Sequence, residues 1–255
     1  MKHTLLPLSV LILTAAPTAM AEDAPQPIGD EFCFSIDGIG ETLGKFDSLK
    51  PEKRDVVGAE IAMQFELEDG ELMPERVELR EGDQARMVMF DDQGRSVGLS
   101  EQLRAMAAPD SVCVMDPLRA ERFGKDIGYS VDFGVGVRFK ATPGTHSLTE
   151  IEEGLKDGRS HYKKMVGAMG FMVPKFTHIA VSGEDETTPP KVFATANGQD
   201  IGEPDFELYD GARMIAVDTL EDMGADGVRI EGDTYRMSPS PDAKTVAKFA
   251  SEDDD

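Results

Sequence analysis

The residues best suited to chemistry near neutral pH are scarce in this chain. It has four histidines, and three of them, His146, His161 and His178, lie beyond the first 21 residues. Histidine is the usual proton carrier at physiological pH and a common metal ligand. None of the three stands at a zinc-site spacing from another histidine or from a cysteine. We therefore expect structural or surface histidines, and we assign no metal ligand and no cofactor.

Cys33 and Cys113 are the only cysteines in the sequence. A redox-active pair would normally occupy one short Cys-x-x-Cys motif, which this spacing does not supply. Both residues instead lie in apolar segments typical of strands, Glu31–Ser35 and Ser111–Met115. In an oxidising compartment, an even pair of this kind is most simply a structural disulfide. We predict a Cys33–Cys113 bridge, worth about 4 to 5 kcal/mol in the chain-entropy model.

One short motif has the form of a catalytic element. Ser160-His-Tyr-Lys163 matches the Ser-x-x-Lys pattern in which penicillin-recognising enzymes place their nucleophile. The two other motifs of those enzymes are missing: no Ser-x-Asn element accompanies the motif, and Lys244-Thr245-Val246 lacks the glycine of Lys-Thr-Gly. The chain also has no Gly-x-Ser-x-Gly elbow. We assign no catalytic residue and favour a non-enzymatic protein, although pairs of acids from distant strands cannot be seen in one sequence.

Two further groups have the chemistry of cation ligands. The acids of residues 221–226 could converge on calcium, but their spacing matches no known calcium loop. Met165, Met169 and Met172 cluster in sequence near two histidines, and thioethers select soft metals such as Cu(I). Met165 and Met169 also fall on the apolar stripe of a predicted helix, where flexible thioethers fill a core. Core packing is therefore the simpler interpretation, and we assign no metal site.

The chain is strongly acidic, with a formal net charge of −23. Such a field repels phosphate backbones and anionic lipid headgroups, which disfavours binding to nucleic acids and attachment to acidic membranes. Two interpretations of the charge stay open: a cationic partner, or a solvated surface that keeps an exported protein soluble. The second is the simpler. Tryptophan is absent, so stacking platforms for carbohydrates are poorly supplied.

Residues 1–21 predict export. A weakly basic start is followed by an apolar run and by Ala19-Met20-Ala21, the small-x-small pattern of a signal-peptidase site. The run is too short to span a bilayer, and no cysteine stands at the cleavage site to carry a lipid. We expect cleavage between Ala21 and Glu22, a location in the periplasm or the medium, and no membrane anchor on the mature protein.

Most of the remaining chain has the pattern of short strands joined by tight turns. Asp-Gly, Asn-Gly and Gly-Asp pairs, beginning with Asp37-Gly38, separate alternating or apolar runs. Gly82-Asp83 and Gly232-Asp233 each predict a hairpin, and Asp91-Asp92-Gln93-Gly94 predicts a turn rather than a calcium loop. The expected strands are Phe32–Ile36, Ile61–Leu67, Arg76–Arg80, Arg86–Phe90, Ser111–Met115, Tyr129–Phe139, Thr177–Ser182, Val192–Ala196, Arg213–Asp218, Val228–Glu231 and Tyr235–Met237.

The segment Tyr129–Phe139 has the clearest strand pattern. Its odd positions are aromatic or valine, and its even positions include Ser130, Asp132 and Arg138. A period of two this regular predicts that one face packs in a core while the other is exposed to water or closely approached.

One long helix is predicted after residue 147. Ser147 and Glu150 form the Ser-x-x-Glu pattern of a capping box, and apolar residues then recur at helical spacing through residue 169. Gly154 and Gly158 fall inside this helix, and each should weaken it by roughly 1 kcal/mol relative to alanine. A proline at position 174 prevents its continuation. A shorter helix is expected over Ser100–Ala107.

These elements predict a mainly β, α+β protein, with an apolar content of 40% that suffices for a core. We place a signal peptide at 1–21 and a disulfide-stapled, β-sandwich-like domain at 22–117. A β-rich α+β domain with one main amphipathic helix follows at 118–250. The acidic residues 251–255 repel one another and predict a disordered tail.

The sequence bounds the function without naming it. We expect an exported, soluble, non-enzymatic binding or structural module, with an unknown protein or small-molecule ligand that is cationic if the surface charge has a binding role. The alternatives are a periplasmic hydrolase with a carboxylate-based site and a calcium- or copper-binding protein. A cleft holding buried acids with shifted pKa values would favour the hydrolase. Neither the ligand nor the oligomeric state can be deduced from the sequence.

Overall fold

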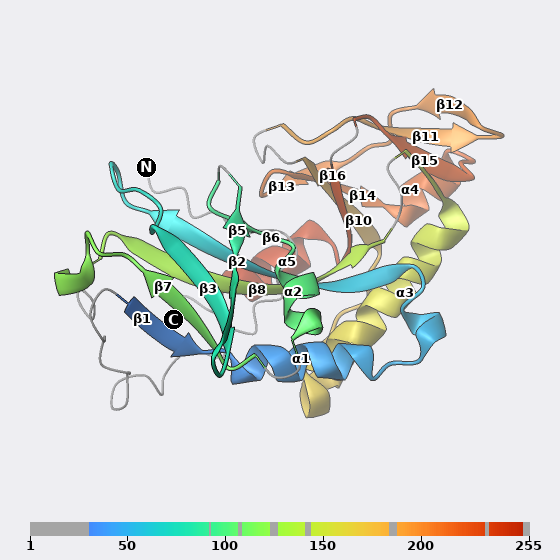
Figure 1. The fold of residues 1–255 in the computed structure, drawn as a ribbon. Coiled ribbons are helices and arrows are strands. Elements are labelled where there is room, and N and C mark those ends of the chain that lie inside the picture. The colour runs from blue at the N-terminus through green and yellow to red at the C-terminus, as the bar shows by residue number, and fades with distance from the viewer. Residues whose placement is uncertain are drawn as a thin grey trace. The chain divides into compact units, whose positions relative to one another are not determined.

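The computed structural model describes residues 31–91, 93–106, 109–122, 127–140, 144–183, 188–232 and 235–251. The expected signal peptide and residues 252–255 lie outside this part, so export, cleavage after Ala21 and a disordered tail stay predictions. The chain forms two compact units, whose elements are labelled in Figure 1. Of the described residues, unit 1 contains Phe46–Ala59 and those from Gly136 onward, and unit 2 contains residues 31–45 and those within Glu60–Val135.

Unit 2 is built on a four-stranded antiparallel sheet in the order β1-β7-β3-β4. Side chains alternate along each strand, so Val77, Leu79, Val112 and Val114 bury one face of this sheet. The strands are β1 (Glu31–Ser35), β3 (Arg76–Glu81), β4 (Gln84–Met87) and β7 (Ser111–Met115), with a further pair β5 (Met89–Phe90) and β6 (Ser96–Val97). The helices are α1 (Asp37–Asp47), which ends just inside unit 1, α2 (Leu99–Ala105) and the short 3₁₀ helix η2 (Ala120–Arg122).

Unit 1 contains two four-stranded antiparallel sheets, β13-β14-β10-β16 and β12-β11-β15-β9. The strands are β9 (Thr145–Ser147), β10 (His178–Gly183), β11 (Val192–Ala196), β12 (Gln199–Gly202), β13 (Glu207–Tyr209), β14 (Ala212–Ala216), β15 (Gly227–Ile230) and β16 (Tyr235–Ser240). The helices are η1 (Pro51–Lys53), α3 (Leu148–Met165), η3 (Gly167–Met172), α4 (Val217–Asp222) and α5 (Ala243–Ser251). Among the described residues, no helix is long and apolar enough to cross a membrane.

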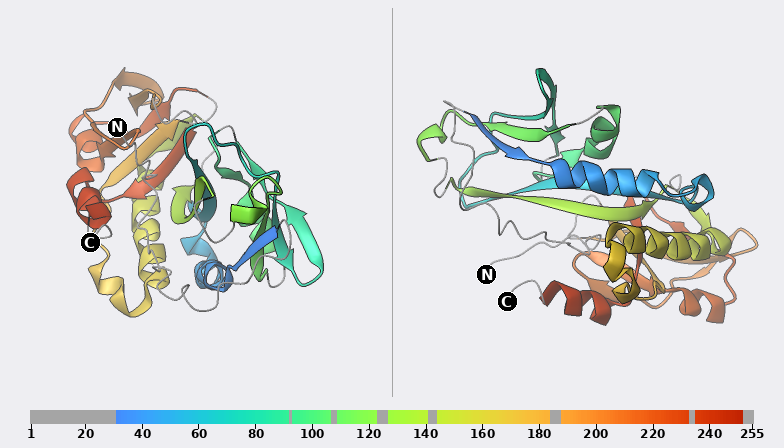
Figure 2. Two further views of the ribbon diagram at one scale, coloured as in Figure 1. Left: turned by 90° about the vertical axis from the view of Figure 1, so that its left-hand side faces the viewer. Right: turned by 90° about the horizontal axis from the view of Figure 1, so that it is seen from below.

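Helix α3 organises unit 1, because it packs against β9 and β15 of one sheet and against β10 and β16 of the other. Figures 1 and 2 show it running from β9 to η3. It begins with the predicted capping box, in which the Ser147 hydroxyl accepts from the Glu150 N–H at 3.2 Å and the Glu150 carboxylate accepts from the Ser147 N–H at 3.0 Å. Ile151, Leu155 and Met165 bury its apolar stripe.

The two glycines of α3 stand where strands come closest to the helix. A Cβ atom on Gly154 would lie 2.0 Å from a ring carbon of Phe139, and one on Gly158 would lie 2.4 Å from a ring carbon of Pro239. Phe139 is at the end of β8 and Pro239 is in β16. The glycines therefore have a packing role besides their cost in helix propensity, because they let one helix face hold both strands.

Strands β2 (Val57–Leu67) and β8 (Tyr129–Phe139) form a two-stranded sheet, and the division between the units falls within both of them. The prediction for Tyr129–Phe139 is confirmed over its full length. Val137 and Phe139 are buried, whereas Asp132 and Arg138 are exposed. The alternation therefore does separate an inner face from an outer face.

The strand predictions are confirmed in most positions, and the fold is a β-rich α+β fold as expected. The hairpin at Gly82-Asp83 is present, with Glu81 paired to Gln84. The turn after β5 is also present, and the Asp91 carboxylate accepts the N–H of Arg95 at 2.9 Å. The predicted hairpin at residues 232–233 is wrong. Strand β15 pairs with β11 and β9 while β16 pairs with β10, because the two strands bury their apolar residues in different sheets.

The helix predictions were incomplete. Helix α2 confirms the expected short helix, but α1, α4 and α5 were missed, and Asp37-Gly38 begins α1 rather than forming a turn. Glycine-rich sequence argues against a helix locally, but Leu43 and Phe46 of α1 are 5% and 3% exposed. Burial of these side chains decides the conformation against the local propensity.

Candidate functional site

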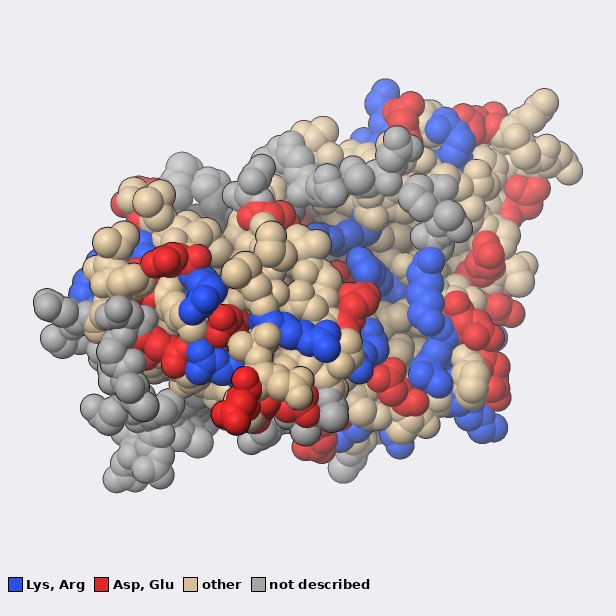
Figure 3. All heavy atoms as spheres, viewed as in Figure 1, with Lys and Arg blue, Asp and Glu red and all other residues tan. Residues whose placement is uncertain are grey.

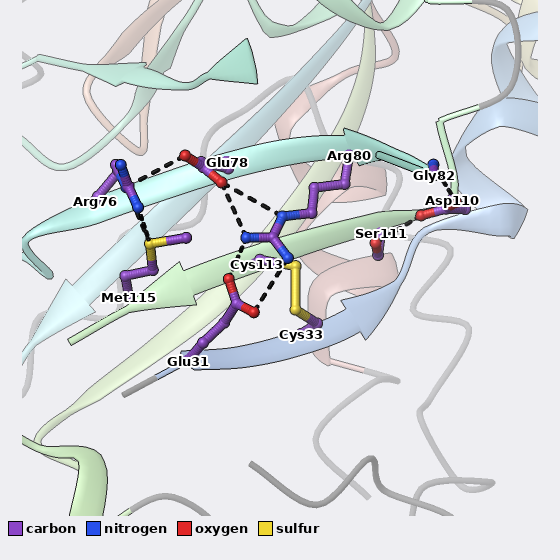
Figure 4. Close-up of a disulfide and its surroundings, with 10 residues drawn as sticks. All are labelled: Glu31, Cys33, Arg76, Glu78, Arg80, Gly82, Asp110, Ser111, Cys113 and Met115. Carbon is purple, nitrogen blue, oxygen red and sulfur yellow. Dashed lines mark hydrogen bonds and ion pairs between the residues drawn. A yellow bond between two sulfur atoms is a disulfide. The ribbon is translucent and has the colours of Figure 1, made fainter. Parts of the chain in front are cut away.

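The predicted disulfide is present in unit 2. Cys33 and Cys113 stand directly opposite each other on β1 and β7, with their Cα atoms 4.0 Å apart. The predicted bridge therefore joins two strands that are already paired. It also closes a loop over a sequence separation of 80 residues. Figure 4 shows it on the charged face of the sheet.

A chain of ion pairs lies beside the disulfide (Figure 4). The Arg80 guanidinium donates to Glu31 of β1, at 3.1 Å for one of its two bonds, and to Glu78 of its own strand at 3.1 Å. Glu78 also pairs with Arg76 at 3.2 Å, and Arg76 donates to the sulfur of Met115. Alternation puts all these side chains on the face opposite the buried valines. Each arginine here already has a carboxylate partner.

The donor atoms of Glu31, Cys33 and Cys113 lie within 4.8 Å of one another, the one such grouping of His, Cys, Asp and Glu in the part of the chain described here. Both sulfurs are bonded to each other, so neither can serve as a thiolate ligand. The acids of residues 221–226 form no such grouping. Asp226 instead accepts the N–H of Asn197 at 2.6 Å and so holds a turn.

The Ser-x-x-Lys motif and the methionines are placed on and after α3. The Ser160 hydroxyl donates to the Lys156 carbonyl at 2.9 Å, which is an ordinary helix contact and not a nucleophile paired with a base. Met165 is buried in the core, as expected. Met172, in contrast, is 57% exposed in η3, and the side chain of Met169 lies outside the description. The three thioethers therefore do not fill one core together.

His161 is fully buried on α3, whereas the sequence left both a structural and a surface position open for it. One ring nitrogen, Nδ1, donates to the Asp157 carbonyl at 3.0 Å, and the ring stacks on Phe46 with centroids 4.3 Å apart. The other nitrogen, Nε2, has no hydrogen-bond partner in the described part of unit 1. Burial lowers the pKa of His161 to about 4, with help from the positive charges of Lys53, Arg54 and Lys140.

A pocket of about 350 Å³ lies in unit 1, where the end of β8 meets the edge strands β9 and β16 of the two sheets. Helix α3 packs against Phe139 of β8 and Pro239 of β16 and so positions two of these strands. The residues that line the pocket are Arg138, Phe139, Lys140, His146, Tyr235, Arg236 and Met237.

A buried histidine–tyrosine pair forms one wall of the pocket. The Tyr235 hydroxyl accepts the Gly144 N–H at 3.0 Å and lies 2.5 Å from Nε2 of His146, which is 2% exposed. Burial lowers the pKa of His146, against the opposing influence of the Glu150 carboxylate. Burial also raises the pKa of Tyr235. Both groups are therefore neutral near pH 7, with the tyrosine donating to an unprotonated Nε2 as the arrangement of donors requires.

The remaining polar lining of the pocket is cationic. Arg138 and Lys140 are two residues apart and exposed, and Arg236 is half-buried on β16. The Lys140 ammonium donates to the Arg54 carbonyl at 2.5 Å, and this acceptor carries no negative charge. Figure 3 shows several Lys and Arg side chains, with Asp and Glu beside them, over the part of unit 1 around α3. No carboxylate, serine, threonine or cysteine lines the pocket among the described residues.

No protein-family model, no curated protein and no solved structure matches this chain. From the sequence we predicted only a structural or surface role for His146 and no pocket around it. One signal for it was present, because Arg138 and Lys140 continue the outer, polar positions of β8 as two cations. The contribution of Tyr235 and Arg236 could not be read in this way, since they come from a strand about a hundred residues further along the chain.

Proposed function

We propose that this protein is an exported, soluble, non-enzymatic binding module, and that the pocket of unit 1 holds a small anionic ligand. The supporting observation is the pocket's lining. Arg138, Lys140 and Arg236 meet there beside a neutral histidine–tyrosine pair, in a chain whose net charge is −23. A general need for solubility explains the acidic surface, but it does not explain cations gathered around one cavity. The acidic sequence suggested a cationic partner, but for this pocket we propose an anionic ligand.

The ligand chemistry follows from the side chains. Arginine presents a planar fork of donors that matches carboxylate and phosphate oxygens, and such charge-assisted bonds are about twice as strong as neutral ones. The Tyr235 hydroxyl is already engaged by His146 and Gly144. A volume of about 350 Å³ is at the small end of ligand sites. These features favour a compact carboxylate or phosphate compound over a polymer.

The hydrolase alternative finds little support in this pocket. Hydrolysis by carboxylates needs two acids near the scissile bond, and covalent hydrolysis needs a nucleophile next to a base. The described lining supplies neither. The neutral His146 is already engaged by Tyr235, which suits a wall that orients a ligand.

The test is isothermal titration calorimetry with two probes, citrate and inorganic phosphate, and with putrescine as a cation control. We expect saturable binding of at least one anion and none of putrescine. Arg236→Gln removes one guanidinium from the pocket and should weaken binding about tenfold or more, since a hydrogen bond to a charged group contributes about 1.5 to 3 kcal/mol.

Arg86→Gln is the matched control, because it makes the same change of charge on an exposed arginine of unit 2 that donates only weakly, at 3.4 Å, to the Ala105 carbonyl. Its affinity should equal that of the unaltered protein. Equal losses in the two variants, or no saturable binding of either anion, would show that the pocket is not an anion site. Turnover of a generic ester or phosphate substrate that is lost in His146→Ala would instead establish an enzyme.

A further inference from the structure

Unit 1 carries a second feature that the pocket does not use. After α3, the 3₁₀ helix η3 presents Phe171 and Met172 to solvent, with 81% and 57% of their surface exposed. Figure 1 and the left view of Figure 2 show η3 as the turn at the far end of α3. A single exposed apolar residue needs no explanation. Two adjacent exposed apolar residues, held in a defined turn within a stretch of sequence that carries only basic charges, call for one.

The conformation of η3 is held by specific contacts. Gly167 has a φ of +58°, which lets the chain turn out of α3. Gly170 lies so close to the preceding helix that a Cβ atom there would be 2.8 Å from the Lys163 carbonyl oxygen. On the other side, the Arg159 guanidinium donates to the carbonyls of residues 173 and 174, at 3.0 Å and 2.8 Å. The turn is therefore built so that Phe171 and Met172 project outward.

The charge around this turn is opposite to that of the chain. Residues 158–183 contain Arg159, Lys163, Lys164 and Lys175 and no Asp or Glu, although Asp and Glu make up 49 of the 255 residues. At that frequency a stretch of this length would hold several acids. Lys164 and Lys175 are exposed on either side of η3. The exposed apolar residues thus lie in a stretch of the sequence whose charged residues are all basic.

We propose that the η3 turn docks reversibly on an anionic lipid surface. Phe171 and Met172 enter the boundary between headgroups and acyl chains, and Lys164 and Lys175 lie against headgroup phosphates. Apolar residues flanked by lysines are the pattern of peripheral membrane contact. Two projecting side chains are also far from the roughly 800 Å² per partner that a stable protein interface needs. The net charge of the chain opposes the approach, but at physiological salt it is screened beyond about 8 Å, whereas the lysines act at contact.

The absence of tryptophan makes insertion directly measurable. Phe171→Trp places a single fluorophore in η3, and Leu208→Trp places one at a control position on β13 that is 66% exposed. Both purified proteins are titrated at 0.15 M salt with vesicles of phosphatidylcholine alone or mixed with phosphatidylglycerol. We expect a blue shift and quenching by brominated acyl chains for Phe171→Trp with the anionic vesicles, and neither change for Leu208→Trp.

Charge variants separate this surface from the pocket. In the Phe171→Trp background, Lys164→Gln with Lys175→Gln should weaken vesicle binding about tenfold or more. The matched pair Lys191→Gln and Lys244→Gln, which also removes two exposed lysines, should leave it unchanged. Arg236→Gln should not alter it either, and free phosphate should not compete. The proposal therefore stands or falls separately from anion binding in the pocket.

Three results would overturn membrane docking. One is an emission spectrum of Phe171→Trp that does not respond to anionic vesicles. Another is an equal response in Leu208→Trp, which would indicate general adsorption. The third is a blue shift that appears without lipid as the protein concentration rises, which would make η3 a contact between copies of this chain.

Discussion

The two units of this protein are both antiparallel β structures, but different interactions stabilise them. Unit 2 has a disulfide between paired strands, and two of its arginines lie between carboxylates: Arg80 contacts Glu31 and Glu78, and the buried Arg119 contacts Asp116 and Glu71. Unit 1 has no cysteine, and its two sheets are held by the packing of α3.

This contrast bears on where a ligand can bind. In unit 2 the arginines on the charged face of the sheet, Arg76 and Arg80, form ion pairs with carboxylates of the same sheet. These ion pairs stabilise the fold. In the pocket of unit 1 three cations, Arg138, Lys140 and Arg236, line a cavity that has no carboxylate in its described lining. Cationic side chains alone do not mark a site. Several cations that line one cavity beside a neutral histidine–tyrosine pair are the stronger indication.

The largest expected change in stability comes from removing the disulfide of unit 2. Replacing both cysteines, as in Cys33→Ala with Cys113→Ala, should lower the stability of unit 2 by about 4 kcal/mol, since the bridge closes a long loop. Hydrogen exchange resolved by peptide should show faster exchange in β1, β3 and β7 and unchanged exchange in α3 and β10. An equal loss of protection in both units would mean that they do not differ in this way.

A drop in pH should lower the stability of unit 1 rather than that of unit 2. All three histidines beyond residue 21 lie in unit 1, and unit 2 has none. Burial lowers the pKa of each, to about 4 for His161 from an ordinary value of 6.5. A lowered folded-state pKa means that the unfolded chain binds the proton more readily, so stability is full above pH 6.5 and falls as the pH drops toward 4.

For His161 alone this loss is about 3 kcal/mol. Urea unfolding between pH 7 and pH 5, followed by hydrogen exchange, should show the decline in unit 1 first. His161→Phe keeps a ring against Phe46 and removes the titrating group, so its unfolding free energy should depend less on pH over this range. A pH dependence that is the same in the variant would show that His161 is not the cause.

The sequence predicted local structure best where one pattern was sufficient. The alternation of Tyr129–Phe139 gave a strand with the right bounds, and Ser147 with Glu150 gave the start of α3. The two cysteines gave the disulfide because there was no other pairing to choose. In each case the physical cause acts between residues that are near in sequence or unique in the chain.

Prediction failed where contacts between distant segments decide the outcome. The glycines of α1 argued for a turn, but burial of Leu43 and Phe46 gave a helix. The hairpin expected at residues 232–233 did not form, because β15 and β16 find other strands. The pocket was invisible for the same reason, since its lining comes from three strands whose adjacency is a property of the fold.

The smallest expected effects test whether the packing of α3 stabilises unit 1. The same substitution, glycine to alanine, should change the stability in opposite directions at two helix positions. Alanine normally favours a helix over glycine by about 1 kcal/mol. In the described part of the chain, no atom outside the adjoining backbone of α1 lies within 4 Å of the position where a Cβ on Gly44 would stand, so Gly44→Ala should stabilise the protein by up to that amount. At Gly158 the same Cβ would meet the rigid ring of Pro239 at 2.4 Å.

Gly158→Ala should therefore destabilise unit 1 by about 2 kcal/mol, because overpacking outweighs the gain in helix propensity. Relief of the clash requires movement of β16, which also carries Tyr235 and Arg236, so anion binding should weaken in this variant and not in Gly44→Ala. Urea unfolding and calorimetry on the two variants provide both readouts. If Gly158→Ala were stabilising, the contact between α3 and Pro239 would not be tight. The packing of α3 would then not explain how the strands that line the pocket are positioned.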